Sequence, residues 1–274
     1  MPSELVTNYF RTETLPHIWC PGCGNGIVTR AIVKAIDNLN IPKDDVCIVS
    51  GIGCSSRAAG YLDFNTLHTT HGRALAFATG VKLANPKLHV IVITGDGDSS
   101  AIGGNHLIHA ARRNIDLTTV VFNNSIYGMT GGQYSPTTPT GDKATTAPYG
   151  SIDPNFDLCE LANAAGATYV ARGTVYAVNI LEKVIQEGII NKGFSFIEAV
   201  TTCPTYYGRK NKKGSAVDMI QYLKENGVMY SAWQKMSEEE KIGKFPIGKL
   251  YSKERKEYTE QYQILIDSLG KGRN

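Results

Sequence analysis

The chain has 274 residues, of which 42% are hydrophobic and 19% are charged. This composition is typical of a globular protein with a sizeable core, and it excludes disorder as the main state. Lysine and arginine exceed aspartate and glutamate by 28 to 25, which is too small an excess to predict binding of nucleic acid. We expect no membrane span and no signal peptide, because long apolar runs are absent from the sequence, and therefore a cytoplasmic location.

The six cysteines are too sparse in a chain of this length for a disulfide scaffold. In a reducing cytoplasm, cysteines that gather at one place more often bind a metal or take part in catalysis. Two of the six are expected to be ordinary core thiols, since Cys47 falls within a predicted strand and Cys159 on the face of a predicted helix.

Two hydrophobic periodicities alternate along about the first 200 residues. In chain order, the pattern predicts the helix Cys23–Asn40, the strand Val46–Ser50, the helix Gly72–Ala84, the strand Leu88–Thr94, the helix Gly104–Arg113, the strand Leu117–Asn123, a long loop from Met129 to Pro154, the helix Asn155–Ala165, the strand Ala167–Ala171, the helix Val175–Ile190 and the strand Phe194–Val200. This alternation predicts an α/β fold with a mostly parallel sheet flanked by helices. Such sheets bind their ligands at the carboxyl ends of the strands.

The alternation stops after Cys203, so we predict a domain at 1–203 and a C-terminal extension at 204–274. The extension holds two expected helices, Ser215–Asn226 and Lys253–Ser268, joined by polar stretches. We expect it to pack on the domain or on a partner subunit.

Polar residues follow two neighbouring predicted strands at their carboxyl ends. The first strand runs into Gly95-Asp96-Gly97-Asp98, and the second ends at Asn123-Asn124. Glycines beside Asp96 let the backbone approach a phosphate closely, and carboxylate and amide oxygens suit Mg²⁺ bridging a diphosphate. An EF-hand is excluded by Leu107 at its twelfth position, and the sequence holds neither a P-loop nor the third glycine of a dinucleotide fingerprint.

Four further cysteines stand at predicted strand ends or helix starts. Cys20 and Cys23 form a CxxC pair that opens a helix, Cys54 follows a strand, and Cys203 follows the last strand of the sheet. Four thiolates suit either a structural zinc ion or a [4Fe–4S] cluster, and a CxxC pair alone suits redox exchange. The spacing alone does not choose between these sites.

These motifs together resemble the β subunit of 2-oxoacid:ferredoxin oxidoreductases, which has a thiamine diphosphate-binding fold. The resemblance rests on WCPGCGNG, GIGCSS, HGRA, GDGD, NNSIYGMTGGQ and TTCP, and it spans residues 17–208. It implies that Asp96 and Asn124 bind Mg²⁺ through their side chains and Ile126 through its carbonyl. The cofactor-binding residues that it implies are Gly53, Cys54, Ser55, His71, Gly72, Gly95, Asp96, Gly97, Asp98, Asn124, Ile126, Gly128, Met129 and Thr130.

The same resemblance favours a [4Fe–4S] cluster over zinc at Cys20, Cys23, Cys54 and Cys203. It also places Arg57 towards the substrate, where a guanidinium suits the distal carboxylate of 2-oxoglutarate. Met129 stands where pyruvate-type relatives usually carry asparagine, which favours a larger 2-oxoacid.

The activity implied is the reversible oxidative decarboxylation of 2-oxoglutarate with coenzyme A, giving succinyl-CoA and CO₂, with electrons passing through the cluster to ferredoxin. An α subunit is expected to supply the glutamate that contacts the aminopyrimidine, in a dimer of heterodimers or a larger complex. The basic run from Arg209 to Lys213 is typical of a solvated patch and also suits an acidic ferredoxin. The alternatives are a pyruvate or broad-specificity enzyme, a non-redox thiamine diphosphate enzyme and a zinc-stabilised interaction protein.

Overall fold

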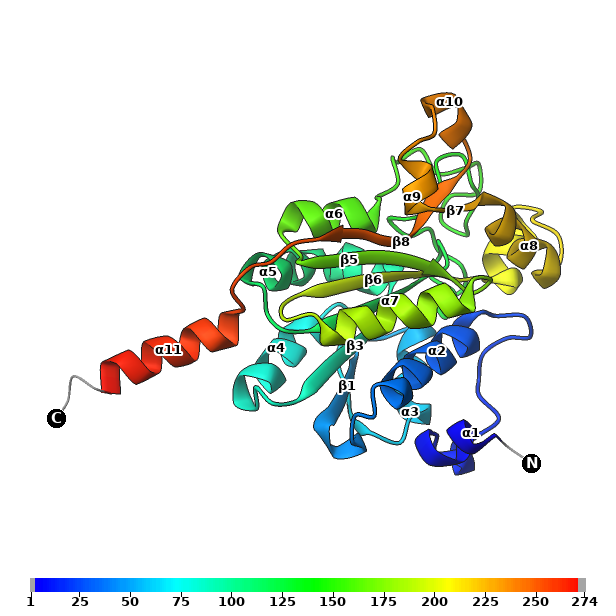
Figure 1. Ribbon diagram of the computed structural model, residues 1–274. Coiled ribbons are helices and arrows are strands. Elements are labelled where there is room, and N and C mark those ends of the chain that lie inside the picture. The colour runs from blue at the N-terminus through cyan, green and yellow to red at the C-terminus, as the bar shows by residue number, and fades with distance from the viewer. Residues whose placement is uncertain (1–2, 271–274) are drawn as a thin grey trace.

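A single twisted sheet organises the computed structural model, which describes residues 3–270 (Figure 1). Its strands lie in the order β2-β1-β3-β4-β6-β5-β8-β7, and β8 runs antiparallel to β5 while the other neighbours are parallel. The strands are β1 Val46–Ser50, β2 Asn65–His68, β3 His89–Gly95, β4 Thr118–Asn123, β5 Tyr169–Thr174, β6 Ser195–Val200, β7 Gly227–Met229 and β8 Phe245–Ser252.

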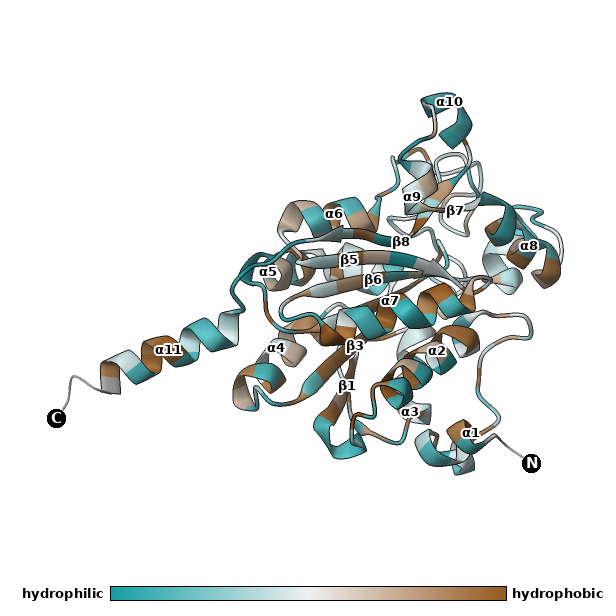
Figure 2. Cartoon of the chain, viewed as in Figure 1, coloured by the Kyte–Doolittle hydropathy of each residue, from teal (hydrophilic) through white to brown (hydrophobic). Residues whose placement is uncertain are grey.

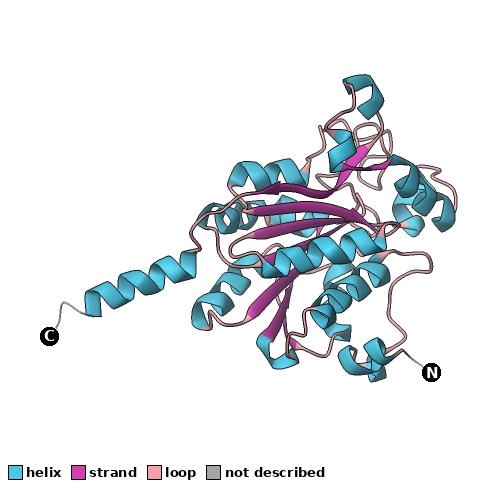
Figure 3. Ribbon diagram, viewed as in Figure 1, coloured by secondary structure: helices cyan, strands magenta, loops and turns pink. Residues whose placement is uncertain are grey.

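Helices cover both faces of the sheet, as Figures 1 and 3 show. On one face α2 (Asn25–Asn38) and α7 (Val178–Ile190) pack over a core cluster that includes Ile32 and Ile197. On the other face α4 (Ala74–Ala84), α5 (Gly104–Arg113) and α6 (Leu158–Ala165) pack over a second cluster. The central strands are mostly apolar because both of their faces are buried, although β5 and β6 carry the buried charges Arg172 and Glu198.

The remaining helices lie at the edges of this body. They are α1 Glu4–Tyr9, α3 Ala58–Tyr61, α8 Ala216–Asn226, α9 Tyr230–Trp233, α10 Glu238–Lys241 and α11 Tyr258–Gly270. Single π-helical turns follow two strands of the sheet, at Asp98–Ile102 and Pro204–Gly208. No helix within residues 3–270 combines the length and the apolar character needed to cross a bilayer.

The predicted mostly parallel α/β sheet and its five strands are confirmed to within a few residues at their ends. Four helices begin later than the periodicity predicts, among them α7, which begins at Val178 rather than at Val175. Helix α2 starts at Asn25 because Cys20 to Gly24 form a turn, and α4 starts at Ala74 after a turn at Gly72 with φ of 69°. Helix α6 starts at Leu158, since the carboxylate of Asp157 caps it by accepting from the backbone N–H groups of Cys159 and Glu160.

The C-terminal segment differs from the expectation of two helices joined by polar stretches. Residues 227–252 hold β7, two short helices and β8, and β8 pairs with β5 from Tyr169 to Arg172. The second expected helix begins at Tyr258 rather than at Lys253. Periodicity missed β8 because Pro246 and Gly248 interrupt its apolar pattern, and it missed β2 because that edge strand is mostly exposed. The boundary at residue 203 stays a prediction.

A buried ion pair fastens α4 to the loop before β4, and we expect its loss to destabilise the fold. Lys82 Nζ lies 2.6 Å from Asp116 Oδ2 and donates to the Leu88 carbonyl, and only 4% of the Lys82 side chain is exposed. Removal of one partner leaves a largely buried charge unpaired, so Lys82→Ala should lower the free energy of unfolding by about 3 kcal/mol. Lys34→Ala, which breaks the more exposed pair with Asp37, should cost less than about 1 kcal/mol. Thermal unfolding followed by circular dichroism measures both, and equal losses would contradict the prediction.

Candidate active site

A cavity of about 430 Å³ opens at the carboxyl ends of β1, β3 and β4. Every residue that the family resemblance assigns to the cofactor lines this cavity, with the exception of Gly72. Four lining residues were not predicted, namely Ile52, Phe122, Tyr127 and Gln133. Segments about 80 residues apart in the chain therefore meet at one place.

Asp96 lines this cavity, and the side chains of residues 3–270 that donate to it both approach the same carboxylate oxygen. Its Oδ2 accepts a hydrogen bond of 2.5 Å from Ser135 Oγ, and Thr137 Oγ1 lies 2.7 Å from the same atom. Only 3% of Asp96 is exposed, and this burial raises the pKa of its carboxyl to about 6, although both hydroxyls act in the opposite direction. A buried carboxylate in such a position gains much from a cation.

Two tight turns at the end of β4 shape the other side of the predicted metal site. Asn123 Oδ1 accepts from the N–H of Ser125, and Asn124 Oδ1 accepts from the N–H of Ile126. Ser125 has a positive φ of 60°, and Thr138 donates to its carbonyl. Carboxylate, amide and carbonyl oxygens from Asp96, Asn124 and Ile126 are the hard ligands that Mg²⁺ prefers, with phosphate oxygens completing the octahedron. The donor set fits a magnesium diphosphate.

The second aspartate of the GDGD motif has a different environment. Asp98 Oδ2 accepts from Thr94, while its Oδ1 accepts from the N–H of Gly72 and lies 2.6 Å from His71 Nδ1. Both oxygens are therefore used to hold the His71–Gly72 turn against the end of β3. This explains why Gly72, predicted to bind cofactor, is absent from the cavity lining while His71 is part of it.

Tyr127 closes the cavity over the glycines of this motif. Its hydroxyl donates to the Gly97 carbonyl at 3.0 Å, and a Cβ on Gly97 would lie 2.2 Å from the tyrosine ring. Burial, with help from the charges of Asp96 and Asp98, raises the pKa of Tyr127 to about 12. A neutral phenol therefore packs beside the predicted diphosphate site, and only glycine fits at residue 97.

The four predicted cysteine ligands gather beside the same cavity. Thr202, next to Cys203, donates to the Gly22 carbonyl, and its own carbonyl accepts from Gly24 in the turn that carries Cys20 and Cys23. Trp19 Nε1 donates to the carbonyl of Cys54 at 2.6 Å. Two independent hydrogen-bonded links thus hold the N-terminal turn against the ends of β1 and β6.

The thiols are close enough to affect one another. Burial, together with the neighbouring thiols of Cys203 and Cys20, raises the pKa of Cys23 to about 12 and that of Cys54 to about 11. Such thiols stay protonated until a metal displaces the proton. Cys54 also lines the cavity, and a Cβ on Gly128 would lie 3.5 Å from the Cys54 sulfur and 3.7 Å from that of Cys203.

The sulfurs lie further apart than the four ligands of a single zinc ion would. Zinc bound by four thiolates at about 2.3 Å needs its sulfur ligands about 3.8 Å apart. Within residues 3–270, no three of the four sulfurs lie within 4.8 Å of one another. A [4Fe–4S] cluster requires a wider cage, because each thiolate binds a different iron. Cys47 and Cys159 are buried in the core instead, as predicted.

The predicted substrate residues differ in position. Met129 lines the cavity and is 45% exposed. Arg57 ends the short 3₁₀ helix Ser55–Arg57, is exposed, and does not line the cavity. The substrate contact that the resemblance predicts for its guanidinium would therefore have to be made from outside this lining.

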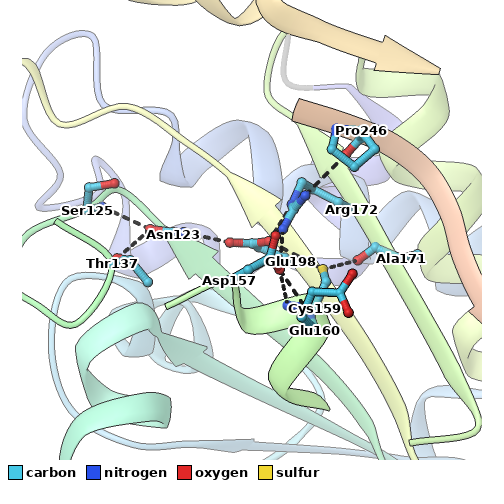
Figure 4. Close-up of polar contacts among 10 residues, drawn as sticks. All are labelled: Asn123, Ser125, Thr137, Asp157, Cys159, Glu160, Ala171, Arg172, Glu198 and Pro246. Atoms are coloured by element: carbon cyan, nitrogen blue, oxygen red, sulfur yellow. Dashed lines mark hydrogen bonds and ion pairs between the residues drawn. The ribbon is translucent and has the colours of Figure 1, made fainter. Parts of the chain in front are cut away.

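A polar network that the sequence did not reveal continues from the metal site into the sheet (Figure 4). Thr137 Oγ1 lies 3.0 Å from Asn123 Oδ1, and Asn123 Nδ2 donates to Glu198 at 2.6 Å. Arg172 Nε lies 2.5 Å from the other oxygen of Glu198. The network therefore joins Asp96 to buried charges on β5 and β6, and these line a second cavity of about 660 Å³ that shares Asn124 with the first.

One part of this network resembles a metal site in its spacing alone. The ligand atoms of Asp157, Cys159 and Glu198 lie within 4.8 Å of one another. Arg172 already bridges both carboxylates, since its Nη2 lies 2.7 Å from Asp157, and burial raises the pKa of the Cys159 thiol so that it donates to Glu198. The guanidinium thus occupies the place that a cation would take.

Thr137→Val should weaken the binding of thiamine diphosphate with Mg²⁺ about tenfold. A hydrogen bond to a carboxylate contributes about 1.5 kcal/mol, and without it Ser135 is the one side chain within residues 3–270 that still donates to the buried Asp96. Titration with Mg²⁺ and thiamine diphosphate, followed by protein fluorescence, measures the affinity. The matched control is Thr140→Val in the same loop, whose hydroxyl donates to the Asp153 carbonyl on the exposed side. Equal affinities for the two variants would show that Thr137 does not orient Asp96.

Comparison with known proteins places this geometry in a family. Residues 51–199 match the family described as "Thiamine pyrophosphate enzyme, C-terminal TPP binding domain". The chain is 58% identical to the 2-oxoglutarate synthase subunit KorB of Methanocaldococcus jannaschii, over 95% of this chain and 97% of that protein. It is 54% identical to the subunit of the same name from Methanothermobacter marburgensis, over 96% of this chain and 93% of that protein.

A solved structure shows the same fold. The 2-oxoglutarate:ferredoxin oxidoreductase of Magnetococcus marinus, with 2-oxoglutarate, coenzyme A and succinyl-CoA bound, superposes with a TM-score of 0.86 at 31% identity, covering 98% of this chain and 92% of that one. The fold, the cavity and these relatives agree, and the chain belongs to the KorB family, the β subunits of 2-oxoglutarate:ferredoxin oxidoreductases.

Proposed function

We propose that the chain holds thiamine diphosphate, Mg²⁺ and a [4Fe–4S] cluster in a 2-oxoglutarate:ferredoxin oxidoreductase. The complex would convert 2-oxoglutarate and coenzyme A to succinyl-CoA and CO₂, and it would pass the electrons through the cluster to ferredoxin. The relatives named above are subunits of such enzymes.

One observation supports this proposal above the others: the cavity lined by Asp96 and Asn124 is also lined by Cys54. A diphosphate site and a thiolate cage that share a wall bring an organic cofactor and an iron–sulfur cluster close together. A non-redox thiamine enzyme with a structural zinc ion gains nothing from this proximity. The wide spacing of the cysteine sulfurs also argues against zinc.

The protein's own groups position and shield the cofactors. Asp96, Asn124 and the Ile126 carbonyl would hold Mg²⁺, while Gly97 lets the Tyr127 ring pack against the loop beside the diphosphate. Thiamine diphosphate supplies the carbanion chemistry of decarboxylation, and the cluster accepts electrons. The buried side chains of Phe122 and Ile126 line the cavity and would shield the bound cofactor from water.

The partner subunit would complete the site. Thiamine enzymes use a glutamate against the aminopyrimidine, and among the described residues none that lines the cavity is a glutamate. We therefore assign that glutamate to an α subunit, in a dimer of heterodimers or a larger complex. An acidic ferredoxin would dock on the basic run from Arg209 to Lys213, of which Arg209, Lys210, Lys212 and Lys213 carry the charge.

The proposed cluster makes a direct prediction for iron content. The complex purified anaerobically should carry about four irons for each copy of this chain and should reduce ferredoxin only when 2-oxoglutarate and coenzyme A are both present. Cys203→Ser should lose most of the iron and acid-labile sulfide, because one of four thiolate ligands is gone. Cys47→Ser, which alters a thiol in the β1 core, should keep both. Zinc in place of iron in the unmodified complex would refute the proposal.

Arg57→Ala tests the substrate assignment. Loss of a guanidinium that binds a carboxylate should lower kcat/KM for 2-oxoglutarate by about ten- to one-hundredfold, since hydrogen bonds between charged groups contribute roughly 1.5–3 kcal/mol. The value for pyruvate, which lacks the second carboxylate, should barely change. Arg30→Ala serves as the control, because exposed Arg30 on α2 pairs with Glu182 on α7 and does not line the cavity. Equal losses for both substrates would favour a pyruvate or broad-specificity enzyme.

A further inference from the structure

Glu198 and Arg172 form a buried ion pair that the proposed chemistry does not use. They face each other across β6 and β5, they are 3% and 5% exposed, and Arg172 Nε lies 2.5 Å from Glu198 Oε2. Strands β1 and β3 of the same sheet carry mainly the hydrophobic colour in Figure 2. A buried ion pair is weak evidence of added stability, because the desolvation of both charges offsets their attraction. The pair therefore calls for an explanation beyond the stability of the sheet.

The second oxygen of the Glu198 carboxylate faces the end of β4. Its Oε1 accepts a hydrogen bond of 2.6 Å from Asn123 Nδ2 (Figure 4). A carboxylate only accepts hydrogen bonds, whereas a side-chain amide has one donor end and one acceptor end. Glu198 therefore requires the Asn123 amide to turn its nitrogen towards β6 and its oxygen towards the loop that follows β4.

The orientation of this amide shapes the turn that carries two of the proposed magnesium ligands. Asn123 Oδ1 accepts from the backbone N–H of Ser125 at 3.0 Å, and Ser125 has the positive φ of 60° that bends the chain there. Asn124 and Ile126 flank Ser125 in the sequence. A reversed amide would set two N–H donors against each other, so the turn depends on the direction in which Asn123 points.

The same amide oxygen also lies beside the group that holds the third proposed ligand. Thr137 Oγ1 is 3.0 Å from Asn123 Oδ1 and 2.7 Å from Asp96 Oδ2. One side-chain amide thus contacts both the turn after β4 and a hydroxyl that orients Asp96. Groups one step removed from a metal ion in this way fix the orientation of its ligands.

We propose that Glu198 is a positioning residue for the magnesium site and acts through the amide of Asn123. The inference rests on the proposed function, because it concerns the Mg²⁺ that would accompany thiamine diphosphate. Glu198 sets the direction of the amide, and the amide sets the turn that carries Asn124 and Ile126. Arg172 holds Glu198 in place from the neighbouring strand.

Glu198→Gln tests this role, because it keeps the shape of the side chain and replaces one acceptor oxygen by a donor. The new side chain can accept from Arg172 only by presenting its NH₂ group to Asn123, which favours the reversed orientation of that amide. In the purified complex, the dissociation constant of Mg²⁺ should rise about tenfold or more, since groups that orient metal ligands typically contribute ten- to one-hundredfold to affinity. Titration with Mg²⁺ at a fixed, high concentration of thiamine diphosphate, followed by protein fluorescence, measures this constant.

Asp157→Asn is the matched control. It removes the other carboxylate that pairs with Arg172, whose Nη2 lies 2.7 Å from Asp157. Within residues 3–270 the Asp157 side chain accepts from Arg172 and from the first turn of α6, and asparagine also caps helices well. The control therefore changes the buried charge as much as Glu198→Gln does, without facing Asn123. The dissociation constant of Mg²⁺ should change less than about threefold.

The double variant Glu198→Gln with Asn123→Asp exchanges the donor and the acceptor across the same contact. The new amide can then donate to the new carboxylate, whose second oxygen accepts from the N–H of Ser125, and the total charge is unchanged. The dissociation constant of Mg²⁺ should return to within about threefold of that of the unmodified complex. Such a recovery separates the orientation of one amide from general damage to the fold.

The proposal fails if Glu198→Gln binds Mg²⁺ as tightly as the unmodified complex, if Asp157→Asn loses as much affinity, or if the double variant binds no better than Glu198→Gln alone. Iron content and thermal unfolding of each variant should match those of the unmodified complex, because the substitutions preserve side-chain shape. Absence of Mg²⁺ and thiamine diphosphate binding in the unmodified complex would instead contradict the proposed function itself.

Discussion

The parallel register of β1, β3, β4 and β6 is the constraint on which the site depends. Ser50 pairs with Ile93, Gly95 with Phe122, and Asn123 with Val200. This register ends neighbouring strands at nearly the same level, so that the residues just beyond them meet. Asp96, Asn124 and Cys203 are each one to three residues past such an end, and a slip of one strand by a residue would turn its side chains to the opposite face.

Residues close to strand ends could be predicted from the sequence, while long-range partners could not. The strands gave strong apolar signals, so the positions of Asp96, Asn124 and the four cysteines followed from strand ends and motifs. Thr137 was missed because it approaches Asp96 from a loop 41 residues further on, and hydroxyls in a Thr- and Pro-rich loop carry no periodic signal. Tyr127 lay within a recognised motif, yet nothing local indicates that its ring covers Gly97.

The tail shows a related limit of sequence patterns. Strand β8 buries Ile247 and Leu250 and has Gly248 at a positive φ of 98°, and it covers the edge that β5 would otherwise expose. An uncovered edge strand invites pairing with other chains. The residues after Cys203 thus contribute to the sheet as well as to any contact with partners, and a polar composition alone conceals this role.

The two aspartates of the GDGD motif show how environment assigns different roles to identical side chains. Asp98 has donors on both oxygens, and a Cβ on Gly51 would lie 2.0 Å from one of them. Its carboxylate is therefore enclosed, and it holds the His71–Gly72 turn against the end of β3. Asp96 is equally buried, but its side-chain donors, Ser135 and Thr137, both approach Oδ2. A buried carboxylate with no side-chain donor on one oxygen gains more from a cation than a carboxylate with donors on both. Binding of a metal ion is therefore more favourable at Asp96, while Asp98 stabilises the conformation of the loop that carries Asp96.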